Sequence, residues 1–225
     1  MKKVTKRKQT WASLDANKVY ALTDAVETLR GFCSSKFDES LEIAIRLGID
    51  ITKADQNIRG MLSLPNGTGK KVRVAVFTND KQDEAKKAGA DVVGGEDLIE
   101  KVAGGQIDFD RVIATPEMMP KMSKVARVLG PKGLMPNPKL GTVTNDVASA
   151  VANAKAGQIE YRAEKNGIIH AGIGKLSFST DKLVENANAL VDQLKKVKPA
   201  SCKGQYILGI AVATTQGPGL HIDAK

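Results

Sequence analysis

The segment Lys36-Phe37-Asp38-Glu39-Ser40-Leu41-Glu42 combines, over a short stretch, side chains of three kinds that could recognise a nucleic acid. Phe37 offers a ring that could stack on a base or a sugar, and Lys36 could meet a phosphate. Ser40 and Glu42 could exchange hydrogen bonds with ribose hydroxyls, and a carboxylate that accepts from 2′-OH groups or guanine amines is specific where lysine is not. The other interpretation is that Phe37 is a core residue at the entrance of a strand, and the sequence leaves it open.

A second candidate is the segment Gly130–Thr144, GPKGLMPNPKLGTVT, which is rich in glycine and proline. Proline removes a backbone donor and glycine weakens regular elements, so we predict a rigid loop here and neither a helix nor a central strand. Leucine and methionine lie inside the loop between Lys132 and Lys139, so it presents apolar and cationic groups on a fixed surface. The loop begins with the GXXG pattern, ending at Gly133, with which KH domains clamp a nucleic-acid backbone, although four residues alone are a weak signal.

The composition favours a polyanion as partner. The chain has 225 residues, 42% of them hydrophobic and 4% aromatic, and a formal net charge of +9. Lysine and arginine side chains that contact phosphates release condensed counterions, so nucleic acid is the natural partner of such a chain. The other interpretation is that the excess lysine only keeps the protein soluble, and composition does not decide between the two.

Localisation signals are few. The N-terminal segment Met1–Lys8 is basic and no apolar stretch follows it, so we expect a flexible cationic arm and not a signal peptide. No apolar run reaches the ~20 residues that a membrane-spanning helix needs, so no membrane partner is expected. Cys33 and Cys202 show neither CxxC nor metal-ligand spacing, which fits a reducing compartment and predicts no metal site. These features favour a cytoplasmic protein.

Catalytic and cofactor motifs are weak. The two histidines, His170 and His221, are accompanied by no serine or cysteine nucleophile motif, so we expect no catalytic residue. The segment Gly67-Thr68-Gly69-Lys70 resembles part of a phosphate loop, but Leu64 and Lys71 stand where the Walker motif needs Gly and Ser or Thr. A turn or a hinge is the better interpretation, and no cofactor is expected.

Hydrophobic periodicity predicts an interrupted fold. Apolar and polar residues alternate over 41–49, which indicates a strand with one buried face, and Thr23 could cap the helix before it. Over 72–115 short β-branched runs alternate with helical segments, which is typical of βαβ units and a parallel sheet. A methionine-rich stripe over 118–129 then predicts a helix that faces the core. Strands return at 159–162 and 168–173, joined by a turn at Lys165-Asn166-Gly167, and a long helix capped by Thr180 and a strand over 206–214 follow.

Neither flank has enough strands to cover its own helices, whereas together they supply a normal two-layer domain. We therefore predict two domains of α/β and α+β class. A discontinuous α+β domain, residues 1–67 and 158–225, carries an inserted three-layer Rossmann-like α/β domain, residues 68–157, and glycine-bearing linkers indicate a hinge. Within the insert, residues 80–110 are net negative and 111–155 net positive, so the basic part, which holds the glycine- and proline-rich loop, is expected to face nucleic acid.

Ordered segments of the chain resemble the L-one family of large-subunit ribosomal proteins, in its bacterial type. They are Lys36–Glu42, Ala54–Gly60, Leu64–Lys70, Ala114–Pro116, Gly130–Thr144, Gly167–Phe178 and Thr215–Gly219. The last segment departs from the family pattern Ser/Thr-Thr-Met-Gly-Pro-Gly, because Gln216 stands where methionine is usual. Glutamine keeps the length and flexibility of methionine and adds an amide, so we expect its contact to survive in altered form.

The resemblance implies a split domain with an insert and a structural role in the ribosome. The implied partners are large-subunit ribosomal RNA, the exit-site tRNA whose release the mobile stalk assists, and the leader of the protein's own mRNA, whose translation it represses. The protein is expected to be a monomer when free. The implied RNA-binding residues are Lys36, Phe37, Ser40, Glu42, His170, Lys175, Ser177, Thr215, Gln216 and Gly217, with Lys132, Gly133 and Lys139 as contacts of the second domain.

Two other classes of function stay open at this point. A free RNA-binding regulator would share the basic surface and would need no ribosome. A nucleotide-dependent enzyme would use the α/β insert, and the incomplete phosphate loop argues against it.

Overall fold

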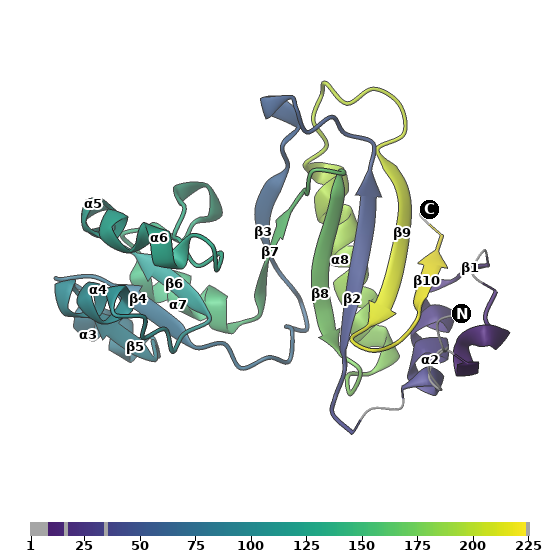
Figure 1. Ribbon diagram of the computed structural model, residues 1–225, viewed down its shortest axis with the longest axis horizontal. Coiled ribbons are helices and arrows are strands. Elements are labelled where there is room, and N and C mark those ends of the chain that lie inside the picture. Colours follow the sequence, from purple (N-terminus) through teal and green to yellow (C-terminus); the bar gives the residue numbers. More distant parts are fainter. Residues whose placement is uncertain (1–8, 16–17, 34–35, 224–225) are drawn as a thin grey trace, which may run out of the picture. The chain divides into compact units, whose positions relative to one another are not determined.

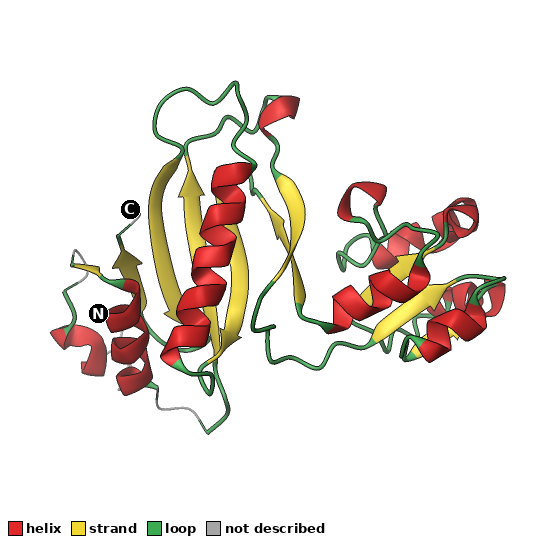
Figure 2. Ribbon diagram, turned by 180° about the vertical axis from the view of Figure 1, so that it is seen from behind, coloured by secondary structure: helices red, strands yellow, loops and turns green. Residues whose placement is uncertain are grey.

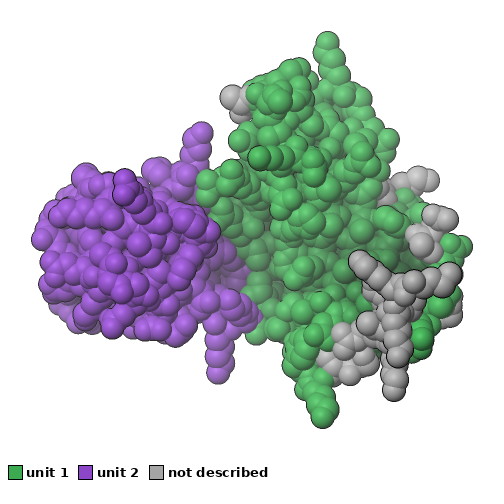
Figure 3. Space-filling view, in the orientation of Figure 1, with its two compact units in different colours: residues 1–69, 159–225 green, residues 70–158 purple. Residues whose placement is uncertain are grey.

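The computed structural model describes residues 9–15, 18–33 and 36–223, so the expected cationic arm Met1–Lys8 lies outside the described residues. The chain divides into two compact units (Figure 3). Unit 1 comprises Met1–Gly69 and Ile159–Lys225, and unit 2 comprises Lys70–Gln158. Each unit has its own hydrophobic core.

Unit 1 is built on a mixed sheet whose strands come from both ends of the chain (Figure 1). Its strand order is β1 (Val19–Tyr20), β10 (Gly219–Ile222), β9 (Ile207–Thr214), β2 (Ser40–Leu47) and β8 (Ile168–Lys175). Only β1 and β10 pair in parallel, and the other neighbours are antiparallel. The interior strand β2 therefore has a partner from the C-terminal part of the chain on each side.

Two helices, α2 (Leu22–Phe32) and α8 (Thr180–Lys196), pack against each other and cover one face of this sheet (Figure 2). The expected alternation in β2 is confirmed: Leu41, Ile43 and Ile45 are buried, whereas Glu42 and Arg46 are exposed. Successive side chains of a strand point to opposite faces, so the apolar set meets the helices and the other set forms an outer face.

The ends of the helices differ from the sequence prediction. Helix α2 begins at Leu22 with Ala21 before it, so Thr23 lies inside the helix and does not cap it. Helix α8 includes Thr180, and Ser179 precedes it. Short 3-10 helices, η1 (Trp11–Ser13) and η2 (Ala54–Gln56), complete the described helices of unit 1.

A second, two-stranded sheet in unit 1 pairs β3 (Arg59–Ser63) with β7 (Gln158–Arg162). From β7 the chain turns directly into β8, as the signal at residues 165–167 predicts, and Gly167 takes a positive φ of 72° there. The sequence did not predict β3. Its glycine, Gly60, is required by packing, because a Cβ at this position would lie 2.5 Å from the Tyr161 hydroxyl.

A buried asparagine in α8 holds the segment that leaves β3. The Asn186 side chain is fully buried. Its Oδ1 accepts from the backbone amide of Asn66 at 3.1 Å. Its Nδ2 donates to the backbone carbonyls of Gly67 at 2.9 Å and Ile173 at 2.7 Å. One side chain thus ties the turn after β3 to both α8 and β8. Its burial is tolerated because every polar atom is paired.

Unit 2 has a parallel sheet of order β5 (Val92–Gly94), β4 (Val74–Phe77) and β6 (Arg111–Ala114). One face packs against α3 (Gln82–Lys87) and α7 (Val147–Lys155), and the other against α4 (Glu96–Ala103) and the methionine-rich segment. Strands β4 and β6 are buried on both faces, as is usual for parallel sheets between helices, whereas β5 is partly buried. Unit 2 is thus an α/β structure of three layers.

The methionine-rich segment is not the single helix that its periodicity predicts. It divides into η3 (Pro116–Met118), α5 (Met119–Met122), η4 (Ser123–Val125) and α6 (Ala126–Leu129). Proline at positions 116 and 120 cannot donate a backbone hydrogen bond, which favours such short pieces. The apolar stripe nevertheless faces the core as predicted, with Met118, Met122, Val125 and Leu129 buried.

The Asn186 contacts generate a stability prediction. Asn186→Leu removes the partner of the Asn66 amide and of the two carbonyls that Asn186 Nδ2 binds, so the free energy of unfolding should fall by roughly 2–4 kcal/mol. Asn188→Leu makes the same change at an exposed position of the same helix and should shift it by about 0.5 kcal/mol or less. Urea denaturation measures both, and equal effects would show that the buried contacts contribute nothing.

We propose that the predicted discontinuous domain folds without its insert. A chain that joins residues 1–67 to 158–225 through a short glycine linker keeps every strand of the two sheets of unit 1. It should therefore unfold in one cooperative thermal transition. It should also retain most of the RNA affinity that the family resemblance implies. A melt without a cooperative transition would contradict the domain assignment.

Candidate nucleic-acid interface

Segments far apart in the sequence meet at one end of the main sheet of unit 1. Residues 36–40 lead into β2, residues 175–178 end and follow β8, and residues 214–217 end and follow β9. Because β2 runs antiparallel to both neighbours, its first residue, Ser40, pairs with Lys175 and lies beside the end of β9. We call these three segments the strand-end cluster.

The C-terminal segment is fixed to the start of β2 by backbone and side-chain bonds. The Ser40 amide donates to Thr215 Oγ1 at 3.0 Å, and the Thr215 amide donates to the Ser40 carbonyl at 3.1 Å. The backbone amide of Gln216 donates to Glu39 Oε2 at 3.2 Å, and Glu39 is only 2% exposed. The buried Glu39 therefore holds the backbone of Gln216 in place, a role that the sequence analysis did not assign.

The segment after β8 is held by the same entry segment. Lys175 Nζ donates to Ser40 Oγ at 2.8 Å and to the Asp38 carbonyl at 3.2 Å. Asp38 accepts from Ser177 twice, from its hydroxyl at 2.8 Å and from its amide at 3.1 Å. The sequence analysis did not assign this bracing role to Asp38. The sequence places Asp38 between two predicted site residues, Phe37 and Ser40, which is the only local hint of this role. The residues that it bonds lie more than a hundred positions away in the sequence.

The aromatic ring of the cluster is accessible. Phe37 is 49% exposed, which excludes the alternative that it is a core residue at the strand entrance. Lys36, Thr215 and Gln216 are exposed as well. The cluster therefore presents an exposed ring together with cationic, hydroxyl and amide groups.

Gly217 has a steric role within its turn. A Cβ at this position would lie 2.1 Å from the hydroxyl oxygen of Thr214, which is buried under the turn. The Gly217 amide donates to the Thr214 carbonyl at 3.2 Å and closes the turn. Glycine is therefore needed for the turn itself, whether or not RNA approaches it.

The outer face of the main sheet extends from the cluster and carries small side chains. Glu42 is in register with Gly172 and Ala213, and the next outward position of β2 is in register with His170. His170 and Glu42 are both exposed on this face. The predicted site residues of unit 1 thus occupy the strand-end cluster and the adjoining sheet face, and His170 lies about 17 Å along β8 from Lys175 at roughly 3.3 Å per residue.

In unit 2, the predicted glycine- and proline-rich loop contains one short 3-10 helix, η5 (Pro138–Leu140). Asn137 braces the loop. Its backbone amide donates to Thr142 Oγ1 at 2.8 Å, and its side-chain Oδ1 accepts from the backbone amide of Lys139 at 2.9 Å. Lys132, Gly133 and Lys139 are exposed, and Gly133 has a positive φ of 71°. These three residues belong to unit 2 and do not form part of the strand-end cluster.

Within the described ranges, no three His, Cys, Asp or Glu side chains lie close enough together to bind a metal ion. In the same part of the chain, no helix has the length and apolar character needed to cross a membrane.

An exposed ring, hydroxyl groups and cations held on a fixed backbone are what an RNA-binding protein presents to bases and ribose. The comparison with known families is more specific. The model of the ribosomal protein L1p/L10e family matches residues 29–218, and the chain belongs to this family. It is a ribosomal protein that binds ribosomal RNA.

The Thr215 hydroxyl gives a prediction about the cluster. Thr215→Val keeps the β-branched shape and removes the acceptor of the Ser40 amide, so the free energy of unfolding and the free energy of RNA binding should each fall by roughly 1 kcal/mol, about fivefold in affinity. Thr215→Ser keeps the hydroxyl and should behave like the parent. Urea denaturation and filter binding measure the two effects, and parental values for the valine variant would make Thr215 a simple turn residue.

Proposed function

We propose that the strand-end cluster and the adjoining sheet face are the main surface through which this protein holds large-subunit ribosomal RNA. The observation that carries the proposal is the exposed Phe37 at the start of a braced segment. The next two residues, Asp38 and Glu39, bond to the segments that follow β8 and β9. A braced surface loses little conformational freedom on binding, so more of the contact energy remains as affinity.

Each group has a defined task in this proposal. Phe37 stacks on a base or ribose, Lys36 meets a phosphate, and Glu42 accepts from ribose hydroxyls or base amines. Gln216 presents its side-chain amide to the same RNA. Lys175 holds Ser40 in place and adds positive charge behind it.

The loop of unit 2 is proposed as a second contact, through Lys132, Gly133 and Lys139. Its exposed lysines supply electrostatic attraction, and its braced backbone supplies a fixed surface. In this proposal the protein shapes the mobile stalk of the large subunit and helps deacylated tRNA to leave from the exit site. The free protein is a cytoplasmic monomer that acts structurally and not as an enzyme.

The same surface supports a proposed second role as a translational repressor. RNA-binding proteins of this kind recognise local shape and unpaired nucleotides, so an mRNA leader that mimics the ribosomal site would bind the same residues. The competing candidate is a free RNA-binding regulator without a place in the ribosome. Sedimentation of tagged protein with large subunits supports the ribosomal role, and its presence only in ribosome-free fractions would support the regulator.

The stacking role of Phe37 gives the direct test. Phe37→Ala should weaken binding to in vitro transcribed large-subunit ribosomal RNA by about 1–3 kcal/mol, or about five- to 150-fold, because a stacking contact is lost. Phe37→Trp keeps a ring and should bind within a few-fold of the parent. Since the ring is half exposed, melting temperatures should hardly change. Filter binding that gave equal affinities for the alanine variant and the parent would remove the cluster as the RNA surface.

A further inference from the structure

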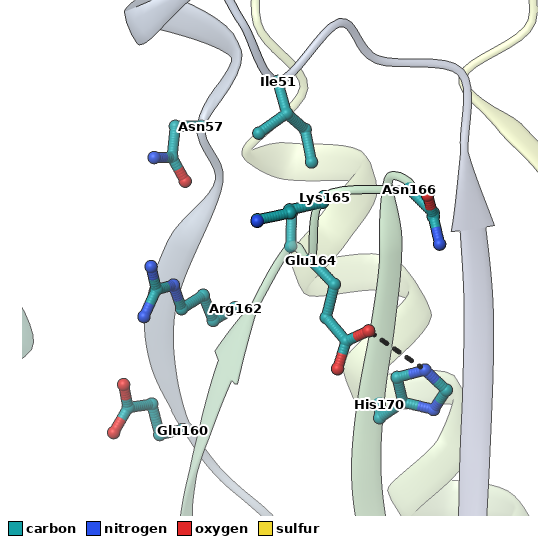
Figure 4. A pocket seen from close by; sticks show the side chains of 9 residues that line it. Ile51, Asn57, Glu160, Arg162, Glu164, Lys165, Asn166 and His170 are labelled. Atoms are coloured by element: carbon teal, nitrogen blue, oxygen red, sulfur yellow. Dashed lines mark ion pairs between the residues drawn. The ribbon is translucent and has the colours of Figure 1, made fainter. Parts of the chain in front are cut away.

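Unit 1 contains a cavity of about 760 Å³ beside the outer face of the main sheet (Figure 4). It is lined by Ile51, Asn57, Glu160, Arg162, Ala163, Glu164, Lys165, Asn166 and His170. Pockets for small molecules span roughly 300–1,000 Å³, so the space suits a ligand of that size. His170, which the sequence analysis placed in the RNA surface, forms part of its wall.

The alternation of β7 explains the polar lining. Tyr161 and Ala163 are buried in the core of unit 1, so Glu160, Arg162 and Glu164, which all line the cavity, lie on the opposite side. Figure 4 shows Glu164 reaching toward His170. Because β7 pairs with β3 and then turns back into β8, these side chains stand across from the outer face of the sheet.

The lining combines cations with carboxylates, which suits a ligand that carries both an anionic group and hydrogen-bonding groups. Glu160 is bound by Arg59, whose Nη2 and Nε lie 2.9 and 3.0 Å from its Oε1, so its charge is compensated. Glu164 Oε2 lies 3.9 Å from His170 Nε2. Arg162 and Lys165 are exposed cations in the same lining.

The amide groups of the lining add donors and acceptors. Asn57 and Asn166 contribute to opposite parts of the wall (Figure 4). A side-chain amide can both donate to and accept from the edge of a base, and a guanidinium can stack on the base or bind its phosphate. Together with the cations, this is the chemistry that recognises one nucleotide.

We propose that this cavity holds a single unstacked nucleotide of the RNA bound at the strand-end cluster. The inference rests on the proposed function, because the RNA must already lie on that surface. Between the two places the outer face carries Glu42, an acceptor for ribose hydroxyls in this proposal, among small side chains that let RNA approach the sheet closely: Gly172, Ala44, Ala211 and Ala213. Arg162 contacts the base or its phosphate, and Asn57 reads the base edge.

The test is chemical probing of the Watson–Crick edges of large-subunit ribosomal RNA bound to the full chain. Dimethyl sulfate reports adenine and cytosine, and a carbodiimide reports guanine and uracil. The parent should protect one nucleotide that Arg162→Met exposes again, with affinity reduced about fivefold or more through the lost contact. Asn57→Ala should expose the same nucleotide, so the result does not depend on one variant.

Lys196→Met is the matched control, because it removes one positive charge from the exposed end of α8. It should keep the protection and bind within about twofold of the parent. A parental footprint and parental affinity for both cavity variants would overturn the inference. If Phe37→Ala still weakened binding in that experiment, the proposed function would stand and only the nucleotide site would fall.

A free nucleotide is the other source of the same chemistry. Nucleoside monophosphates added to the RNA-free protein, followed through the His170 ring signals by NMR, distinguish the two sources. Saturable binding of a monophosphate combined with an unchanged RNA footprint in Arg162→Met would assign the cavity to a free nucleotide and overturn the proposal. Weak monophosphate binding with the predicted change in footprint supports it.

Discussion

The pairing of β2 with β8 on one side and β9 on the other is the constraint on which the rest of unit 1 depends. Residues of the N-terminal part of the chain form an interior strand of the sheet, and both neighbours of that strand come from the C-terminal part. This pairing brings Ser40, Lys175 and Thr215 together, and it places one row of side chains against α2 and α8. It also requires the chain to leave unit 1 after β3 and return at β7, so the intervening residues form a unit of their own.

The acidic residues of the cluster show how negative charge could serve the RNA-binding surface that we propose. Asp38 accepts two bonds from Ser177, and Glu39 accepts one from the Gln216 amide. Hydrogen bonds to a charged acceptor are stronger than those between neutral groups, so a carboxylate is an effective brace for a loop. In the proposed interface, neighbouring lysines would supply the positive charge for phosphates, while the carboxylates keep the backbone in place.

Local patterns predicted those parts of the fold whose physics is local. The alternation in β2, the turn before β8 and the strand and helix order of unit 2 follow from nearby residues. Strands β1, β3 and β10 were missed. All three are short, β3 and β10 contain glycine, and pairing with neighbouring strands stabilises them. The exposure of Phe37 depended on packing that no local pattern encodes. The braces from Asp38 and Glu39 were likewise invisible, since their partners lie at the other end of the sequence.

The position of β9 has a consequence for synthesis of the protein. A nascent chain emerges from its N-terminus at about 5–20 residues per second, and β2 is made long before β8 and β9. The strands of unit 2, which follow one another closely, find their partners as soon as they emerge. The apolar face of β2 must wait, and neither the sheet nor the strand-end cluster exists until the chain has passed Thr215. Chains that end before Thr215 therefore lack the bonds that brace the strand-end cluster, and with them the RNA surface that we propose.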